Sequence, residues 1–251
     1  MNKIMQLIKD NFNLAKSPIN LVKNSNEASI YIYDVIDAWW GVSALSVVDA
    51  IEQAAGAEVL RVYINSPGGS VFEARAMMAA IQRFEGTTVA HIDSLCASAA
   101  TSVALACNTV EISDGAFFMI HNASTLAWGD KTTMRETADL LEKIETAIVD
   151  DYAAKTGKSK DEIITLMDAE TWFTAQEALD NGFIDTIKPR ATADKTSNVA
   201  KNAWNLSAYA NAPKIEPVPE KIEITEIPEP ATAGFLMGAA NKNKLALLQA
   251  L

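Results

Sequence analysis

Three short stretches of the sequence carry residue types that could cooperate in nucleophilic catalysis. Gly68-Gly69 follows one strand-like run, Ser98 follows a second, and His121 ends a third. A serine hydroxyl is a poor nucleophile at neutral pH and needs a neighbouring base such as histidine. Paired glycines let backbone N–H groups approach a ligand, and a helix start favours negative charge. Together the stretches indicate attack on a carbonyl with stabilisation of the resulting oxyanion.

Each stretch also has a purely structural interpretation. Residues 94–107 are rich in Ala and Ser, and taken alone they favour a tightly packed buried helix. The Gly68-Gly69 pair fits a tight turn, and His121 fits a core histidine. His121 nevertheless ends its strand beside polar Asn122, which favours a base at the rim of a site. His91 is the competing base, but it lies within its strand.

The elements that would position these residues alternate between strand-like and helix-like patterns. Strand-like runs cover residues 29–36, 59–65, 88–92, 109–113 and 116–121, and the last two are separated by a turn at Asp114-Gly115. Helical spacing covers residues 45–56 and 74–86, and a capping box Ser70…Glu73 opens the second helix. This alternation predicts an α/β fold with largely parallel strands, whose carboxyl ends carry the reactive loops.

A long helix and two shorter capped helices follow. The long helix is expected from Thr133 to Gly157, with an apolar stripe formed by Met134, Leu141, Ile144, Ile148 and Tyr152. Such a stripe fits either packing against another subunit or packing on the chain's own core. Capping boxes at Ser159…Glu162 and Thr174…Glu177 open the two shorter helices.

Composition narrows the class of protein. The chain has 251 residues, 49% of them hydrophobic, which is enough for one substantial core and an appendage. Its net charge of −11 argues against binding to nucleic acid or anionic membranes. Two cysteines, Cys96 and Cys107, read as buried thiols in a reducing compartment, and we expect neither a metal site nor a cofactor. Without a signal peptide or a spanning segment, the expected location is cytoplasmic.

Three regions differ in character along the chain. Residues 1–28 read as a loosely held N-terminal arm, and residues 29–188 carry the strand and helix patterns of a folded domain. Six of the eight prolines follow Lys188, so residues 189–251 are predicted to form a flexible, disordered tail rich in Pro and Ala. The apolar tip of this tail, residues 234–237 and 245–251, either frays in solvent or docks on a partner.

Four motifs resemble those of the Clp protease proteolytic subunit, in the family's order and spacing. They are Ile64-Asn65-Ser66-Pro67-Gly68-Gly69, Ala97-Ser98-Ala99-Ala100, Met119-Ile120-His121 and residues 173–185. The resemblance implies the ClpP/crotonase-like spiral of strand-strand-helix units, with the helix from Thr133 as a protruding handle. It also implies a homo-oligomeric ring, either a heptamer or stacked rings, and serine endopeptidase activity on polypeptides without a cofactor.

The resemblance assigns roles residue by residue. It makes Ser98 the nucleophile, His121 the base, and the backbone N–H groups of Gly69 and Ala99 the oxyanion hole. Alignment on the segment around residues 173–178 places Glu170 where the family usually has an aspartate. A glutamate can also orient a triad histidine. Asp168, two residues earlier, is the alternative acid.

Other features resemble the ClpP-like proteases of tailed phages and prophages. These are Trp39-Trp40-Gly41, the sequence Glu-Thr-Trp-Phe-Thr-Ala at residues 170–175, and the Pro-rich tail. This resemblance implies a head maturation protease that cleaves scaffold or capsid protein in the host cytoplasm or the prohead. The alternatives are a degradation subunit that receives substrate from an unfoldase ATPase, a crotonase-type acyl-CoA enzyme, and a catalytically inactive shell or scaffold component that functions through its tail.

Overall fold

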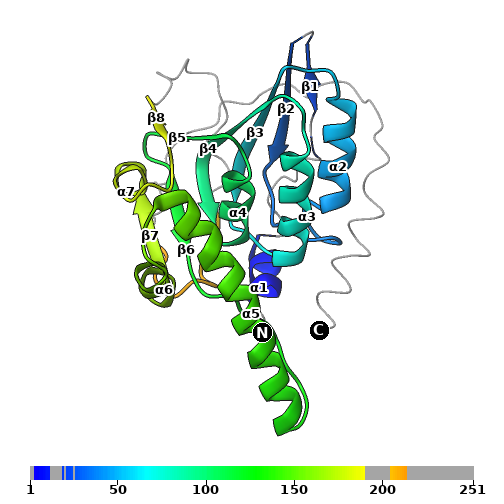
Figure 1. Ribbon diagram of the computed structural model, residues 1–251. Coiled ribbons are helices and arrows are strands. Elements are labelled where there is room, and N and C mark those ends of the chain that lie inside the picture. The colour runs from blue at the N-terminus through cyan, green and yellow to red at the C-terminus, as the bar shows by residue number, and fades with distance from the viewer. Residues whose placement is uncertain (1–2, 12–18, 20, 25, 190–203, 214–251) are drawn as a thin grey trace, which may run out of the picture. The chain divides into compact units, whose positions relative to one another are not determined.

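The computed structural model describes residues 3–11, 19, 21–24, 26–189 and 204–213 (Figure 1). Residues 1–212 form one compact unit, and everything below concerns that unit. The predicted apolar tip, residues 234–237 and 245–251, lies outside the described residues. The predicted division into arm, domain and tail stays a prediction.

In the described part of the chain, the strands form one eight-stranded sheet. Its main path runs β1 (Val22–Lys23), β2 (Glu27–Ile32), β3 (Val59–Ser66), β4 (Thr87–Ala97), β5 (Thr109–Ser113) and β8 (Thr186–Lys188). All neighbours along this path are parallel except β1 and β2. Burial alternates along β2 and β3, so every second side chain enters the core. The predicted α/β fold with largely parallel strands is confirmed.

Strand β4 pairs with two strands in succession along its length. Residues 89–92 pair in parallel with β5, and residues 95–97 pair in parallel with β6 (Phe117–Ile120). The turn at Asp114-Gly115 therefore leads from one neighbour of β4 to the next, rather than joining a hairpin. Strand β7 (Thr171–Thr174) adds antiparallel to β6, with Ile120 opposite Thr171. These registers bring the ends of β4 and β6 and the start of β7 together.

Helices α2 (Ala44–Gln53), α3 (Val71–Gln82) and α4 (Ala99–Leu105) pack against the sheet (Figure 1). The small-residue run is a helix only from Ala99, because pairing with β6 keeps residues 95–97 in the strand. The predicted capping box at α3 is half formed. Ser70 accepts the N–H of Glu73, but the Glu73 carboxylate accepts the N–H of Ala44 at 2.6 Å and so ties α3 to α2.

Helix α5 (Lys131–Thr156) projects beyond the sheet, in line with the predicted handle (Figure 1). Its last turns pack on the chain's own core through buried Ile148, Val149 and Tyr152. Its first half carries exposed Met134 and Leu140. The second half of α5 therefore packs on the chain's own core, and packing of the first half against another subunit stays a prediction. The capping boxes predicted for α6 (Lys160–Asp168) and α7 (Ala175–Asp180) are both present.

A helix lies within the stretch predicted to be a loose N-terminal arm. Helix α1 (Lys3–Asp10) buries Leu7 and Ile8, which are 1% and 2% exposed. Eight residues are too few to form a stable helix alone, so α1 depends on tertiary packing that its sequence does not reveal. Residues 204–213, a described portion of the predicted tail, form hydrogen bonds with the end of α1 and with Asn11 just after it.

Candidate active site

Ser98 stands at the sharp turn between β4 and α4, in a backbone conformation that is costly for a side chain. Its φ of 54° and ψ of −127° lie outside the regions that L-residues favour. Such a residue costs about 1–3 kcal/mol and persists only where its surroundings enforce it. Here the backbone N–H and the hydroxyl of Thr101 both donate to the Ser98 carbonyl, at 2.9 and 2.6 Å. Strain of this kind clusters at functional sites.

His121 follows β6 directly and meets Ser98 across the β4–β6 pair. The N–H of Ser98 donates to the carbonyl of Met119 at 2.9 Å, which locks the two strand ends together. His121 Nε2 then lies 2.8 Å from Ser98 Oγ. The predicted convergence of the serine and the base is therefore present. His91 lies elsewhere, with Ser113 Oγ 3.1 Å from its Nε2.

Burial sets the protonation state of His121. Burial and, to a smaller extent, the charge of Lys3 lower the pKa of the imidazole to about 4, although the charge of Glu170 acts in the opposite direction. At neutral pH His121 is therefore uncharged and able to accept a proton from the serine hydroxyl.

The glycine loop after β3 packs directly on the backbone around Ser98. Gly68 has φ +87°, and a Cβ at this position would lie 2.4 Å from the Ala97 carbonyl oxygen and 2.9 Å from the Ala99 nitrogen. Only glycine fits this close approach. Gly69 lines a cavity of about 220 Å³ together with Ser98 and His121, and Ala99 lines a smaller one beside Ser98. Of the two predicted oxyanion residues, Ala99 thus directly follows the nucleophile and Gly69 lines the same cavity as it.

Glu170 lies beside His121 because Ile120 pairs with Thr171 across β6 and β7. It is 8% exposed, and its φ of 47° makes it, with Ser98, one of two non-glycine residues at positive φ in the described chain. The alternative acid, Asp168, is exposed and accepts the side-chain N–H of Asn122 at 2.7 Å. Of the two acids, the structure brings Glu170 to the site.

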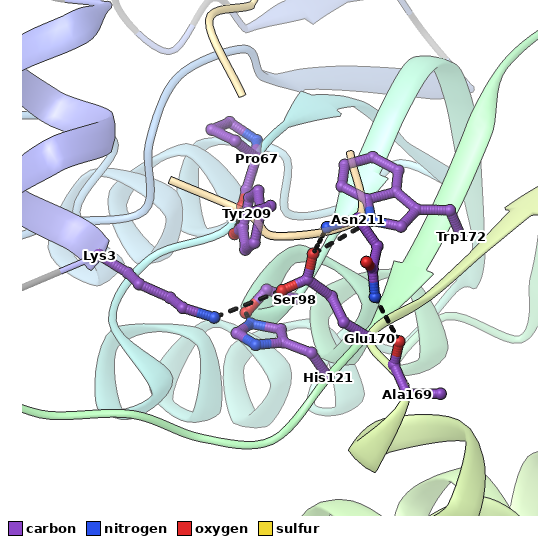
Figure 2. A network of polar contacts seen from close by, with 9 residues as sticks. All are labelled: Lys3, Pro67, Ser98, His121, Ala169, Glu170, Trp172, Tyr209 and Asn211. Atoms are coloured by element: carbon purple, nitrogen blue, oxygen red, sulfur yellow. Dashed lines mark hydrogen bonds and ion pairs between the residues drawn. The ribbon is translucent and has the colours of Figure 1, made fainter. Parts of the chain in front are cut away.

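The carboxylate of Glu170 is occupied by other donors. Its Oε1 accepts the backbone N–H of Asn211 at 2.7 Å, and its Oε2 lies 3.4 Å from the Lys3 ammonium (Figure 2). Burial raises the pKa of Glu170, but these N–H donors and the Lys3 charge lower it more, so the group is ionised. No hydrogen bond between Glu170 and His121 is recorded among the described residues.

Sequence reasoning missed Lys3, Tyr209 and Asn211. Tyr209 is 5% exposed, its ring stands edge-on to His121 at 5.3 Å between centroids, and its hydroxyl donates to the Pro67 carbonyl (Figure 2). Trp204 and Tyr209 were the available signal, because aromatic residues are uncommon in a segment that stays unfolded. No group of three or more potential metal-ligating side chains occurs among the described residues. None of the described helices is long and apolar enough to cross a membrane.

Comparison with known proteins gives one consistent match. The family model described as Clp protease matches residues 16–191. ATP-dependent Clp protease proteolytic subunit 2 of Bifidobacterium longum is 32% identical over 128 residues, which cover 50% of this chain and 61% of that protein. Subunit 1 of Protochlamydia amoebophila is 26% identical over 162 residues, covering 63% of this chain and 79% of that protein.

A solved structure shares the fold. A ClpP1 mutant from Listeria monocytogenes superposes with a TM-score of 0.58 at 21% identity, covering 65% of this chain and 92% of that one. The match to the Bifidobacterium longum subunit spans less than two thirds of that protein's length.

Proposed function

The chain belongs to the Clp protease family, and we propose that it is a serine endopeptidase acting through Ser98, His121 and Glu170. The observation that carries the proposal is the 2.8 Å contact between Ser98 Oγ and His121 Nε2, made by a serine held at positive φ. Nucleophile and base within hydrogen-bond reach are the geometric signature of covalent catalysis by serine. The activity, the substrate and the partners are all part of the proposal.

The proposed reaction follows from this geometry. Neutral His121 takes the proton of the Ser98 hydroxyl as its oxygen attacks a peptide carbonyl. The N–H groups of Gly69 and Ala99 stabilise the negative oxygen that forms. His121 then gives the proton to the leaving amine, which leaves an acyl group on Ser98 that water hydrolyses. Glu170 holds the imidazole through Nδ1–H when its carboxylate is released from its present donors.

We further propose that the substrate is a scaffold or capsid protein, so that the chain acts in head maturation. Support comes from Trp39-Trp40-Gly41, from residues 170–175, and from the residues that extend beyond the family match at residue 191. The second candidate is a degradation subunit that works with an unfoldase ATPase. It is favoured because the matched relatives are described as ATP-dependent Clp protease proteolytic subunits.

Assembly into a homo-oligomeric ring belongs to the same proposal. The first half of α5 carries exposed Met134 and Leu140, and Trp128 just before it is 92% exposed. Apolar side chains gathered on a projecting helix suit a subunit interface. Sedimentation of the full chain tests this, and a monomer at all concentrations would contradict it.

A fluorophosphonate probe with mass spectrometry of the labelled peptide tests the chemistry. We expect Ser98 to be labelled on prolonged incubation and Ser98→Ala to stay unlabelled. Ser102→Ala is the matched control, because Ser102 is a buried serine on the same helix. Equal labelling of wild type and Ser98→Ala would refute the mechanism.

The choice of substrate and the requirement for ATP distinguish head maturation from degradation coupled to an unfoldase. Cleavage of a co-expressed capsid or scaffold protein without ATP supports head maturation. Degradation of a folded substrate only with an unfoldase and ATP supports the second candidate.

A further inference from the structure

Residues 204–211, here called the strap, are joined to α1 by polar contacts. Asn11, just after α1, accepts the N–H of Asn205 at 2.7 Å and donates to the Asn205 carbonyl at 3.0 Å. The Ser207 hydroxyl donates to the Asp10 carboxylate at 2.9 Å. The indole of Trp204 adds a bond to Asn65 at 2.9 Å. The strap and α1 are therefore fastened to each other and to the end of β3.

The strap places Tyr209 over the nucleophile. The Tyr209 hydroxyl donates to the Pro67 carbonyl, and its ring stands edge-on to His121 in the cavity that Ser98 also lines. A scissile carbonyl must reach this same space between the glycine loop, Ser98 and His121. The cavity that remains measures about 220 Å³ and is lined on one side by Lys3, Leu7 and Tyr209. That volume is below the range of about 300–1,000 Å³ typical of small-ligand pockets, and a polypeptide needs more.

The same two segments hold the triad acid. The N–H of Asn211 and the ammonium of Lys3 both bind the Glu170 carboxylate, and the Asn211 side chain donates to the Ala169 carbonyl at 2.8 Å (Figure 2). A triad carboxylate must instead accept from the imidazole. The covering segments thus act on the nucleophile and on the acid together.

We propose that the strap, fastened by α1, is a built-in inhibitor that covers Ser98 and keeps Glu170 from His121 until both segments move away. This inference rests on the proposed peptidase function, because it names the regulation of that same site. Release requires no opening of the sheet, since the strap contacts it through side chains and single backbone groups.

A reversible lock tests the proposal in the full chain. Asp10→Cys combined with Ser207→Cys replaces the 2.9 Å contact by a cysteine pair. Burial raises the pKa of the native thiols, to about 12 for Cys107, so Cys96 and Cys107 stay unreactive. We expect the oxidised double variant to be labelled at Ser98 more slowly than its reduced form by about tenfold or more. Reductant should restore the labelling rate of the double variant. In each single cysteine variant, the oxidant should leave the labelling rate unchanged.

Weakening the strap should have the opposite effect. Tyr209→Ala is expected to raise the labelling rate above that of wild type by about tenfold or more, and Tyr209→Phe, which keeps the ring, by less. If the locked and reduced forms were labelled equally and Ser98→Ala stayed unlabelled, the inhibitory role of the strap would be refuted, whereas the proposed peptidase function would not.

A readout independent of activity separates the two proposals. The chain has two histidines, so the His121 resonance can be assigned in NMR spectra with a His91→Gln variant. Besides Ser98, the groups acting on His121 are Lys3, Glu170 and the Tyr209 ring. Removing the cover in Tyr209→Ala should raise the pKa of His121 towards its ordinary 6.5. An unchanged titration would refute the strap even if Ser98 never reacted with the probe.

Discussion

Replacing Gly68 by alanine tests whether the glycine loop positions the nucleophile. The added Cβ would lie 2.4 Å from the Ala97 carbonyl oxygen, whereas ordinary contact begins at 3.4 Å, so that carbonyl must retreat by about 1 Å. Ala97 precedes Ser98, and its retreat moves Ser98 Oγ relative to His121 Nε2. A displacement of about 1 Å in a reacting group costs about 10²-fold in rate. We expect a loss of this size in labelling of Ser98.

Gly115→Ala is the matched control. Gly115 has φ +85°, against +87° for Gly68, but a Cβ there meets no described atom within 4 Å. Both variants therefore carry the same cost of positive φ, about 1–2 kcal/mol. Only Gly68→Ala adds the clash.

The assay is the initial rate of fluorophosphonate labelling, with urea denaturation alongside. Both variants are made in the Tyr209→Ala background, so that covering of Ser98 by the strap does not affect the labelling rate. Gly115→Ala should lose about 1–2 kcal/mol of stability and keep its labelling rate. Gly68→Ala should lose more stability and about 99% of the rate. Labelling of Gly68→Ala at the parent rate would refute the role given to the loop.

Three further outcomes follow from the site. Ser98→Gly should relieve the positive-φ strain and raise the free energy of unfolding by about 1 kcal/mol in urea, while Ser98→Ala gives no gain and both variants lose labelling. Burial and the charge of Lys3 lower the pKa of His121 from 6.5 to about 4, so between these pH values the unfolded chain binds a proton that the folded protein does not bind. Stability should therefore fall as the pH drops from 6.5 to 4, and urea curves of His121→Gln should lack this component. Tyr152→Phe should cost about 1 kcal/mol, since it removes the buried bond to Thr101, whereas Tyr152→Leu also loses the ring contact with Phe183 and should cost about 3 kcal/mol by thermal unfolding.

The convergence of Ser98 and His121 was predictable from the sequence. Both residues follow strand-like runs, and parallel strands end at one edge of a sheet. Register then completes the geometry, since the Ser98 N–H bonds to the Met119 carbonyl. The periodic helices and the capping boxes at Ser159 and Thr174 were predictable for a similar reason. They depend on residues within a few positions of each other.

The extension of β4 through residues 95–97 was not predictable in the same way. Leu, Cys and Ala, the residues at 95–97, have no strong preference for strand, and the local pattern resembles the helix that follows. Pairing with β6, more than twenty residues away in sequence, decides the conformation. The same non-local pairing explains why Asp114-Gly115 does not form a hairpin, although its residue types are typical of one.

The open choice between Glu170 and Asp168 and the missed strap have one physical origin. Glu170 could be chosen over Asp168 only by alignment, because its partners come from Lys3 and Asn211 at opposite ends of the described chain. Those partners lie in segments whose composition indicates an arm and a tail. The ionised carboxylate stays buried because Lys3 and Asn211 compensate the cost of its desolvation. In the proposed triad, the imidazole Nδ1–H of His121 takes their place once they leave. The Glu170 carboxylate that binds Lys3 and the strap is thus the same carboxylate that the proposed triad needs. In the proposed inhibition, covering Ser98 and withdrawing Glu170 from His121 therefore happen together.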